Sequence, residues 1–310
     1  MRIGLKVDVD TLRGTREGVP ALLRLFDEYA VKATFLFSLG PDHTGRALKR
    51  VFRPGFLSKV SRTSVTSHYG IKTLLYGTLL PGPNISKHAG DIMRAVRDAG
   101  HEVGIHCHDH IKWQDAVARK DAEWTRREFV KAVEAFKQVF GEAPRTHGAA
   151  GWQINPHVLK LEEEFGLDYA SDGRGKTPFY PELQGVRARV PQIPTTLPTL
   201  DELIGVDDIS EDNVHEYVFV ESQKPLPFHV YTLHAELEGM KLLPVMEKLL
   251  VMWKGSQREL GSVRDIYEQL PLEELAVHEL GWGELPGRSG HLIMQGRPLA
   301  RDSNAQEDQE

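Results

Sequence analysis

Apolar and polar residues alternate along residues 2–10, and this period of two predicts a β-strand that ends near Asp10. Asp8 and Asp10 are two residues apart, so we expect both carboxylates on one face at the end of this strand. Apolar residues at helical spacing predict a helix at residues 19–26, and an apolar run predicts a buried strand at residues 31–39. A strand, a helix and a second strand in this order form the unit of a parallel sheet.

The same kinds of pattern continue along the rest of the chain. Apolar residues at helical spacing predict helices at 88–99, 121–140, 155–165, 242–253 and 263–269. Apolar runs predict strands at 145–150, 167–172 and 228–234, a strand running into a loop at 101–110, and short strands near 187–193 and 217–221. The pattern weakens beyond about residue 287. The alternation of strands and helices therefore predicts an α/β fold.

The net charge of −6 conceals a strongly basic segment. Residues 43–90 contain eight Lys and Arg and no Asp or Glu, which leaves a net charge of −14 on the rest of the chain. These cations alternate with large apolar residues among Pro and Gly, so we interpret residues 41–88 as an insertion that contacts an anionic membrane surface or a lipid. A plain insertion or another partner is the alternative, and the overall charge argues against a nucleic-acid-binding protein. The expected lipid or phosphate contacts are Arg46, Lys49, Arg50, Arg53, Lys59, Arg62 and Lys72.

The cysteine content and the first residues of the chain indicate a reducing compartment. Cys107 is the single cysteine, so an intrachain disulfide is excluded, and we expect this side chain to pack in the interior. The first ten residues are charged and lack the apolar core of a signal peptide, so we expect a cytoplasmic protein. The sequence has no run of about 18 apolar residues, so we expect no membrane-spanning helix.

Histidines and aspartates near the ends of predicted strands form a candidate metal site. Residues 101–110 contain four histidines, and His106 and His110, four residues apart, can reach one divalent ion. Asp8 and Asp10 can supply one ligand and one free carboxylate. Each feature alone has an ordinary explanation, as hydrogen-bonded histidines and as a turn at a strand end. Their combination at the carboxyl ends of parallel strands favours a catalytic site.

Four motifs together resemble those of the polysaccharide deacetylase family, also called the NodB homology family. The motifs are VDVDT at residues 7–11, GHEVGIHCHDH at 100–110, RTHGAAGW at 145–152 and YTLHAELEG at 231–239. The resemblance implies a distorted (β/α)7 barrel over residues 1–270 with the basic, apolar insertion within it. Residues 271–310 would then form a C-terminal extension, and we expect its acidic tail, from about residue 300, to be disordered.

The resemblance also implies a role for each matching residue. The expected roles are general base for Asp8, metal ligands for Asp10, His106 and His110, orientation of the base for Arg145, general acid for His234, and support of the site for Asp172 and Trp152. The cofactor would be one divalent metal ion. Two histidines and one aspartate accommodate zinc, manganese, cobalt or nickel, so this ligand set does not select among them.

A narrower resemblance concerns the substrate. The motifs KVDVDT, GIHCHDHIKW, THGAAGWQ and TLHAELEG resemble the family members that remove formate from a formamido sugar linked to polyprenyl phosphate. That reaction belongs to lipid A modification and resistance to cationic peptides, and it implies peripheral association with the cytoplasmic face of the inner membrane. The alternatives are a soluble glycan deacetylase or related amidohydrolase with the same site, and a non-catalytic module that binds lipid or metal.

Overall fold

The computed structural model describes residues 1–47 and 71–300, and its framework is a parallel β-sheet. Within these residues the sheet has seven strands, six of which follow the order β5-β4-β3-β2-β1-β8, while β9 pairs with the start of β1. The strands are β1 (Arg2–Val9), β2 (Thr34–Ser38), β3 (Glu102–Cys107), β4 (Thr146–His147), β5 (Tyr169–Ala170), β8 (Phe228–His234) and β9 (Glu259–Gly261). The predicted α/β fold is therefore confirmed.

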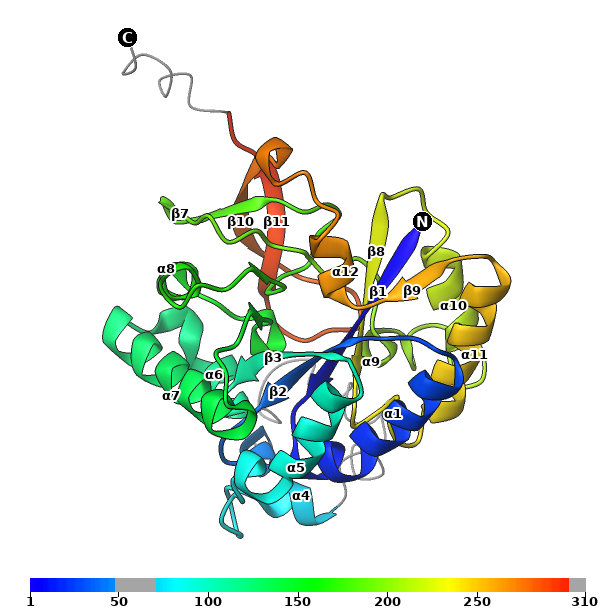
Figure 1. The fold of residues 1–310 in the computed structure, drawn as a ribbon, viewed down its shortest axis with the longest axis horizontal. Helices are drawn as coiled ribbons and strands as arrows, with labels where there is room; N and C mark the ends of the chain where they lie inside the picture. Colours follow the sequence, from blue (N-terminus) through cyan, green and yellow to red (C-terminus); the bar gives the residue numbers. More distant parts are fainter. Residues whose placement is uncertain (48–70, 301–310) are drawn as a thin grey trace.

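Helices surround the strands of this sheet (Figure 1). The α-helices are α1 (Val19–Glu28), α4 (Ile71–Leu75), α5 (Ile85–Asp98), α6 (His110–Ala116), α7 (Ala122–Phe140), α8 (Pro156–Glu164), α9 (Leu200–Leu203), α10 (Val214–Glu221), α11 (Leu243–Gly255) and α12 (Val263–Tyr267). Single turns form η1 (Gly14–Gly18), η3 (Val117–Arg119), η4 (Ala150–Trp152) and η5 (Leu272–Glu274). Local sequence signals explain several boundaries. The side chain of Asp121 caps α7, which stops at Gly141 in a left-handed conformation, and the side chain of Asn155 caps α8.

An irregular segment joins the two ends of the strand order. The amide of Ile193 donates a hydrogen bond to Ala170 in β5, and the amide of Thr196 donates one to Val230 in β8. Strands β5 and β8, which lie at opposite ends of the sheet, are thereby bridged by one stretch of chain. This closure agrees with the expected distorted barrel, and the predicted fold class is confirmed.

A second, smaller sheet lies on the other side of the molecule from α1 and α5 (Figure 1). Its strand order is β11-β10-β6-β7, with the strands β6 (Tyr180–Leu183), β7 (Val186–Arg187), β10 (Val277–Gly283) and β11 (Leu292–Pro298). Backbone hydrogen bonds join β11 to the loop after β5, because the amide of Arg174 donates to Ile293 and the amide of Gln295 donates to Arg174. The C-terminal extension therefore packs directly against the loops of the main sheet.

Two local predictions are wrong, and one strand lies where the sequence gives only a weak signal. Residues 217–221 were expected to form a short strand but lie in helix α10. The prediction failed because a short run of mostly apolar residues does not distinguish a strand from a buried helix. Strand β11 lies beyond residue 287, where the sequence pattern weakens, and it is defined by its pairing with β10. His110 opens helix α6 rather than lying in a loop, and the side chain of Asp109 caps that helix.

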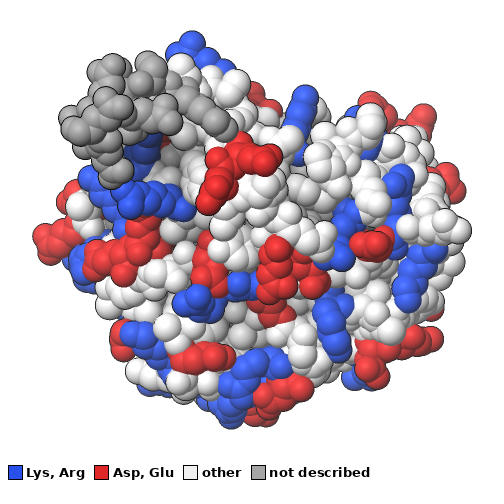
Figure 2. Space-filling model, turned by 45° about the horizontal axis from the view of Figure 1, so that its top comes forward, with Lys and Arg blue, Asp and Glu red and all other residues white. Residues whose placement is uncertain are grey.

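One face of the molecule shows mixed charge among the residues that the structure describes. Figure 2 shows acidic and basic side chains interspersed across the face in view. Of the expected lipid contacts, Arg46 and Lys72 are described, and Nε of Arg46 donates a hydrogen bond to Gly77. Among the described residues, the structure has no helix of the length and apolarity needed to cross a membrane. The predictions for Lys49, Arg50, Arg53, Lys59, Arg62 and the tail from residue 301 lie outside the described residues.

Candidate active site

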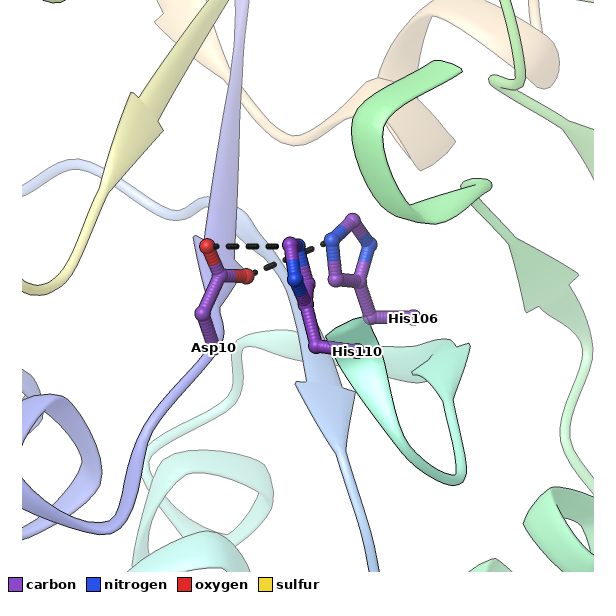
Figure 3. Close-up of side chains that lie close together, drawn as sticks. All are labelled: Asp10, His106 and His110. Atoms are coloured by element: carbon purple, nitrogen blue, oxygen red, sulfur yellow. Dashed lines mark ion pairs between the residues drawn. The ribbon is translucent and has the colours of Figure 1, made fainter. Parts of the chain in front are cut away.

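The three expected metal ligands converge at the carboxyl ends of β1 and β3 (Figure 3). Asp10 follows the last residue of β1, His106 lies in β3 and His110 is the first residue of α6. Nε2 of His106 is 3.3 Å from Oδ1 of Asp10, and Nε2 of His110 is 3.4 Å from Oδ2 of the same carboxylate. The two imidazole nitrogens thus lie against the two oxygens of one carboxylate, and the three residues can each offer one ligand atom to the same ion.

The surroundings of these side chains fit a divalent metal ion. Nδ1 of His106 is 2.6 Å from the carbonyl oxygen of Gly148, so Nδ1 carries the proton and Nε2 is left as the donor atom for a metal. Burial alone would raise the pKa of Asp10, but His110 and His106 outweigh this effect and hold that pKa below its ordinary value. An ionised carboxylate with neutral imidazoles is the donor set that zinc and similar ions prefer.

Asp8 supplies a free carboxylate oxygen beside this point. Its side chain is buried, and Oδ1 has no hydrogen-bond partner among the described residues. The other oxygen, Oδ2, lies 3.7 Å from Nζ of Lys6, which is itself fully buried. The ammonium of Lys6 also donates a hydrogen bond to the carbonyl of Ser171 at 3.2 Å. Asp8 thus has one oxygen near a fixed cation and one oxygen available for a proton.

The prediction that Arg145 orients Asp8 is wrong. Arg145 directly precedes β4 and therefore lies at the amino end of that strand, whereas Asp8 and the metal ligands lie at carboxyl ends. The Arg145 side chain is 62% exposed and forms an ion pair with Asp168 at 2.6 Å. Lys6 contacts Asp8 instead. The sequence contained a signal for this residue, because Lys6, Asp8 and Asp10 alternate and therefore share one face of the strand.

His234 lies beside Asp8 at the end of β8. The two residues are register partners in the parallel pairing of β1 with β8. Burial lowers the pKa of His234, but Asp201 and Asp10 outweigh this effect and raise it. Nδ1 of His234 is buried without a hydrogen-bond partner among the described residues, while its backbone amide donates to Glu238. Glu238 thus anchors the backbone of His234, and the imidazole favours the protonated form that a general acid needs.

Glu236 holds the loop that carries Asp10. Its Oε1 accepts hydrogen bonds from the amide of Asp10 at 3.0 Å and from the amide and hydroxyl of Thr11, each at 2.8 Å. Burial, with the nearby Asp10 carboxylate, raises the pKa of Glu236 to about 8. Sequence reasoning left Glu236 without a role, since an acidic residue after a strand is usually the start of a helix. The structure places it against the backbone of the expected metal ligand.

Asp172 belongs to a buried charge network under the site. Its Oδ1 accepts a hydrogen bond from the amide of Ala149 at 2.8 Å and lies 3.0 Å from Nδ1 of His147, which is also 2.8 Å from Glu162. Burial lowers the pKa of His147, but Asp172 and Glu162 outweigh this effect and raise it to about 10. An imidazolium that lies between the Asp172 carboxylate and the carboxyl group of Glu162 explains this cluster without a second metal ion. Asp172 therefore supports β4 and the turn that follows it.

Trp152 is buried and surrounded by cations. Its ring is 2% exposed, and Nζ of Lys6 lies 5.5 Å from the ring centroid. The guanidinium carbons of Arg174 and Arg288 lie 5.2 and 4.3 Å from the same centroid. Trp152 thus packs against Lys6, which in turn contacts Asp8.

Cys107 is buried beside Ser38, and burial raises the pKa of its thiol well above the ordinary value, which agrees with packing in the interior.

The sequence profile of the polysaccharide deacetylase family matches residues 3–170, the part of the chain that carries Asp8, Asp10, His106 and His110. The chain belongs to this family. It is 36% identical to the 4-deoxy-4-formamido-L-arabinose-phosphoundecaprenol deformylase ArnD of Shewanella sediminis, over 98% of both chains. It is also 32% identical to the protein of the same name from Wigglesworthia glossinidia brevipalpis, over 91% of this chain and 98% of the relative.

Solved structures of family members have the same fold. A protein from Mycobacterium smegmatis classed as a polysaccharide deacetylase superposes with a TM-score of 0.64 at 18% identity, covering 92% of this chain and 94% of the other. The Bc1960 peptidoglycan N-acetylglucosamine deacetylase superposes with a TM-score of 0.53 at 16% identity, covering 87% of this chain and 89% of the other. At these identities the likeness concerns the fold alone.

Proposed function

We propose that this protein is a metal-dependent hydrolase that removes the formyl group from 4-deoxy-4-formamido-L-arabinose-phosphoundecaprenol. The observation that carries this proposal is the match to two deformylases over nearly the whole chain, together with the convergence of Asp10, His106 and His110 beside Asp8 and His234. The products are formate and the free amino sugar on its lipid carrier.

Asp10, His106 and His110 would hold the divalent ion. When bound, such an ion supplies Lewis acidity, which lowers the pKa of water and polarises an amide carbonyl. The unpartnered Oδ1 of Asp8 accepts the proton of the attacking water, and the ammonium of Lys6 beside Oδ2 holds this carboxylate in place. His234 donates a proton to the amide nitrogen as the C–N bond breaks, so that the nitrogen leaves as a neutral amine.

The decisive experiment is to incubate the metal-loaded protein with the formamido-arabinose lipid and to measure formate together with the mass of the lipid product. We expect stoichiometric formate and a lipid that has lost only its formyl group. Asp8→Asn should lower kcat by about 10²- to 10⁴-fold while the protein still binds metal. Full activity of Asp8→Asn, or absence of formate with loaded wild-type protein, would contradict the proposal.

An N-acetylated analogue of the same lipid separates the deformylase from a deacetylase. The chain is 29% identical over 53% of its length to the peptidoglycan deacetylase of Helicobacter pylori, which supports a shared amide-hydrolase chemistry. Release of formate from the formamido lipid, with much slower release of acetate from the analogue, supports the deformylase. Faster release of acetate would favour a deacetylase instead.

We also propose that the basic, apolar insertion brings the enzyme to an anionic membrane surface at the cytoplasmic face of the inner membrane. Leu79 and Leu80, in the described part of the insertion, are 81% and 37% exposed. Backbone hydrogen bonds from Leu80 to Leu75 and from Gly77 to Leu80 fix the turn that carries them. An exposed apolar turn within a stretch of sequence whose charged residues are all cations is typical of a segment that enters the membrane interface.

A further inference from the structure

The turn between β10 and β11 carries an arginine that lies on the indole of Trp152. The guanidinium carbon of Arg288 is 4.3 Å from the ring centroid, and that of Arg174 is 5.2 Å from it. Lys6, which contacts both Asp8 and this ring, lies between the indole and the catalytic carboxylate. The two arginines are therefore separated from the active site by little more than one aromatic side chain.

The two guanidinium groups share a single carboxylate. Nη1 of Arg174 donates to both oxygens of Glu202, at 2.7 and 2.9 Å, and Nη2 donates to the carbonyl of Leu197. Arg288 reaches Glu202 only through Nη1, at 3.5 Å, which is the long limit of a hydrogen bond. Nε and Nη2 of Arg288 have no acceptor among the described residues. The cluster therefore has one positive charge in excess and one guanidinium edge without partners.

This excess charge lies in a largely dehydrated position. The side chain of Arg288 is 13% exposed, that of Arg174 is 8% exposed, and that of Glu202 is 3% exposed. Nε1 of Trp152 is buried and has no hydrogen-bond partner among the described residues. A partly buried cation with unused donors is costly unless an anion meets it, so the cluster is suited to bind a singly charged anion.

The main chain holds Arg288 in this position. Gly287 has a φ of +77°, and a Cβ atom built on it would lie 1.8 Å from the carbonyl oxygen of Glu202. The hairpin is also tied to η4, because Nε2 of Gln153 donates a hydrogen bond of 2.6 Å to the carbonyl of His291. The tip of the hairpin thus lies directly against α9 and η4, and its arginine is preorganised.

We propose that Arg288 and Arg174, on the face of Trp152, form a subsite for the phosphate that links the sugar to the lipid of the substrate. The phosphate oxygens accept hydrogen bonds from Nε and Nη2 of Arg288, whose planar fork matches a phosphate group. The single charge of a phosphodiester neutralises the excess charge of the cluster. This inference rests on the proposed deformylase function and gives the C-terminal extension a role in substrate recognition.

The test compares two substrates, the formamido-arabinose lipid in detergent micelles and a phosphate-free methyl glycoside of the same formamido sugar. Arg288→Gln should lower kcat/KM on the lipid by about ten- to a hundredfold, mainly through KM, and leave kcat/KM on the glycoside unchanged. Arg288→Lys should recover part of the loss, since it restores the charge without the fork. The matched control is Arg297→Gln on the same hairpin. The Arg297 side chain is 79% exposed, so this variant should keep the wild-type kcat/KM on both substrates.

Several outcomes overturn the subsite. An equal loss of kcat/KM on both substrates would show that Arg288 has a structural role. An unchanged kcat/KM on the lipid would show that Arg288 does not bind the substrate. Loss of binding to anionic liposomes by Arg288→Gln, with unchanged kinetics on the lipid in micelles, assigns the arginine to membrane headgroups instead.

A binding measurement keeps this inference separate from the proposed function. Inorganic phosphate should compete with the lipid against wild-type protein, and titration calorimetry should detect phosphate binding to wild type that Arg288→Gln weakens at least tenfold. If wild type releases no formate from either substrate, the deformylase proposal fails, while phosphate binding that depends on Arg288 still supports an anion site. Equal phosphate binding by wild type and by Arg288→Gln would overturn the proposed phosphate subsite.

Discussion

Lys6 is the residue whose position matters most for the proposed base. It lies two residues before Asp8 on the same strand face, is fully buried, and contacts the Asp8 carboxylate, the Ser171 carbonyl and the Trp152 ring. Burial lowers the pKa of Lys6, whereas Asp8 and Asp172 oppose this effect. The two carboxylates thus favour the charged form of Lys6 against the effect of burial, and we assign Lys6 as the positioning residue of the base.

Replacement of Lys6 should affect turnover more than substrate binding. We expect Lys6→Met to lower kcat by about ten- to a hundredfold with a small change in KM, because the base loses its fixed partner. Lys6→Arg should restore most of the activity. Steady-state kinetics on the formamido lipid checks both variants. Arg145→Ala is the control and should keep wild-type kcat, and equal defects in Lys6→Met and Lys6→Arg would disprove a role of the charge.

Glu236 offers a second test at the scale of single residues. Glu236→Ala removes the acceptor of three hydrogen bonds from Asp10 and Thr11, so we expect the metal affinity to fall by about ten- to a hundredfold. Glu236→Gln keeps an oxygen at that position and should bind metal nearly as well as wild type. Competition with a chelator of known affinity measures both. Equal loss in the two variants would mean that the acid itself, rather than its acceptor oxygen, is required.

The residues that the sequence identified and those it missed differ in a physical way. Asp10, His106 and His110 were predictable because metal ligands come in fixed residue types and spacings near strand ends. Arg145 was assigned by motif position alone, and the structure shows that this position lies at the opposite end of the strand. Arg288 was missed because its neighbours in space, Trp152 and Glu202, are far away in sequence.

At the scale of elements, the network of His147, Glu162 and Asp172 connects β4, α8 and the end of β5. The pKa of His147, raised to about 10, lies above its ordinary value of about 6.5. The protonated imidazole therefore stabilises the folded state fully below pH 6.5, and this stabilisation is lost as the pH rises toward 10. Burial also raises the pKa of Glu162, so its ionisation acts in the same direction.

Stability should consequently fall between pH 7 and pH 10. We expect His147→Gln to be less stable than wild type by about 3 to 5 kcal/mol at neutral pH, because the buried carboxylate of Asp172 loses its cation. The difference between the two proteins should shrink as the pH rises. Urea denaturation at pH 7 and pH 9.5 measures the free energy of unfolding of each. A difference that stays constant over this range would rule out a charged His147 in the folded protein.

The elements themselves were largely predictable, and the exceptions have clear causes. Helices such as α7 and α8 combine an apolar stripe with a capping side chain and a terminal glycine or proline, which are local signals. Strand β11 is only partly buried and is defined by its pairing with β10. The closing segment at residues 191–197 also depends on partners distant in sequence. Segments that are defined by such pairing show little hydrophobic periodicity in their own sequence, so the sequence alone does not predict them.

At the scale of the whole molecule, the distribution of charge and of exposed apolar side chains favours the described end of the insertion as the surface that contacts the membrane. The described body has interspersed charges (Figure 2), whereas residues 43–90 carry only cations. Leu79 is the most exposed large apolar side chain among the described residues. The fixed apolar turn belongs to this same stretch of sequence, so it can enter the interface while the cations of the stretch meet anionic headgroups, and the two contributions to binding add.

The double variant Leu79→Ser with Leu80→Ser should therefore weaken binding to anionic liposomes by about tenfold, since part of the transfer free energy of two leucine side chains is lost. Val251→Ser is the matched control, because this 52% exposed valine lies on α11, outside the insertion. Liposome co-sedimentation at low and high salt measures both variants. Hydrolysis of the phosphate-free glycoside should stay at the wild-type rate in each, because the turn lies outside the catalytic residues. Wild-type liposome binding by the double variant would remove the turn from the membrane contact, and a matching loss of glycoside hydrolysis would make it a structural element instead.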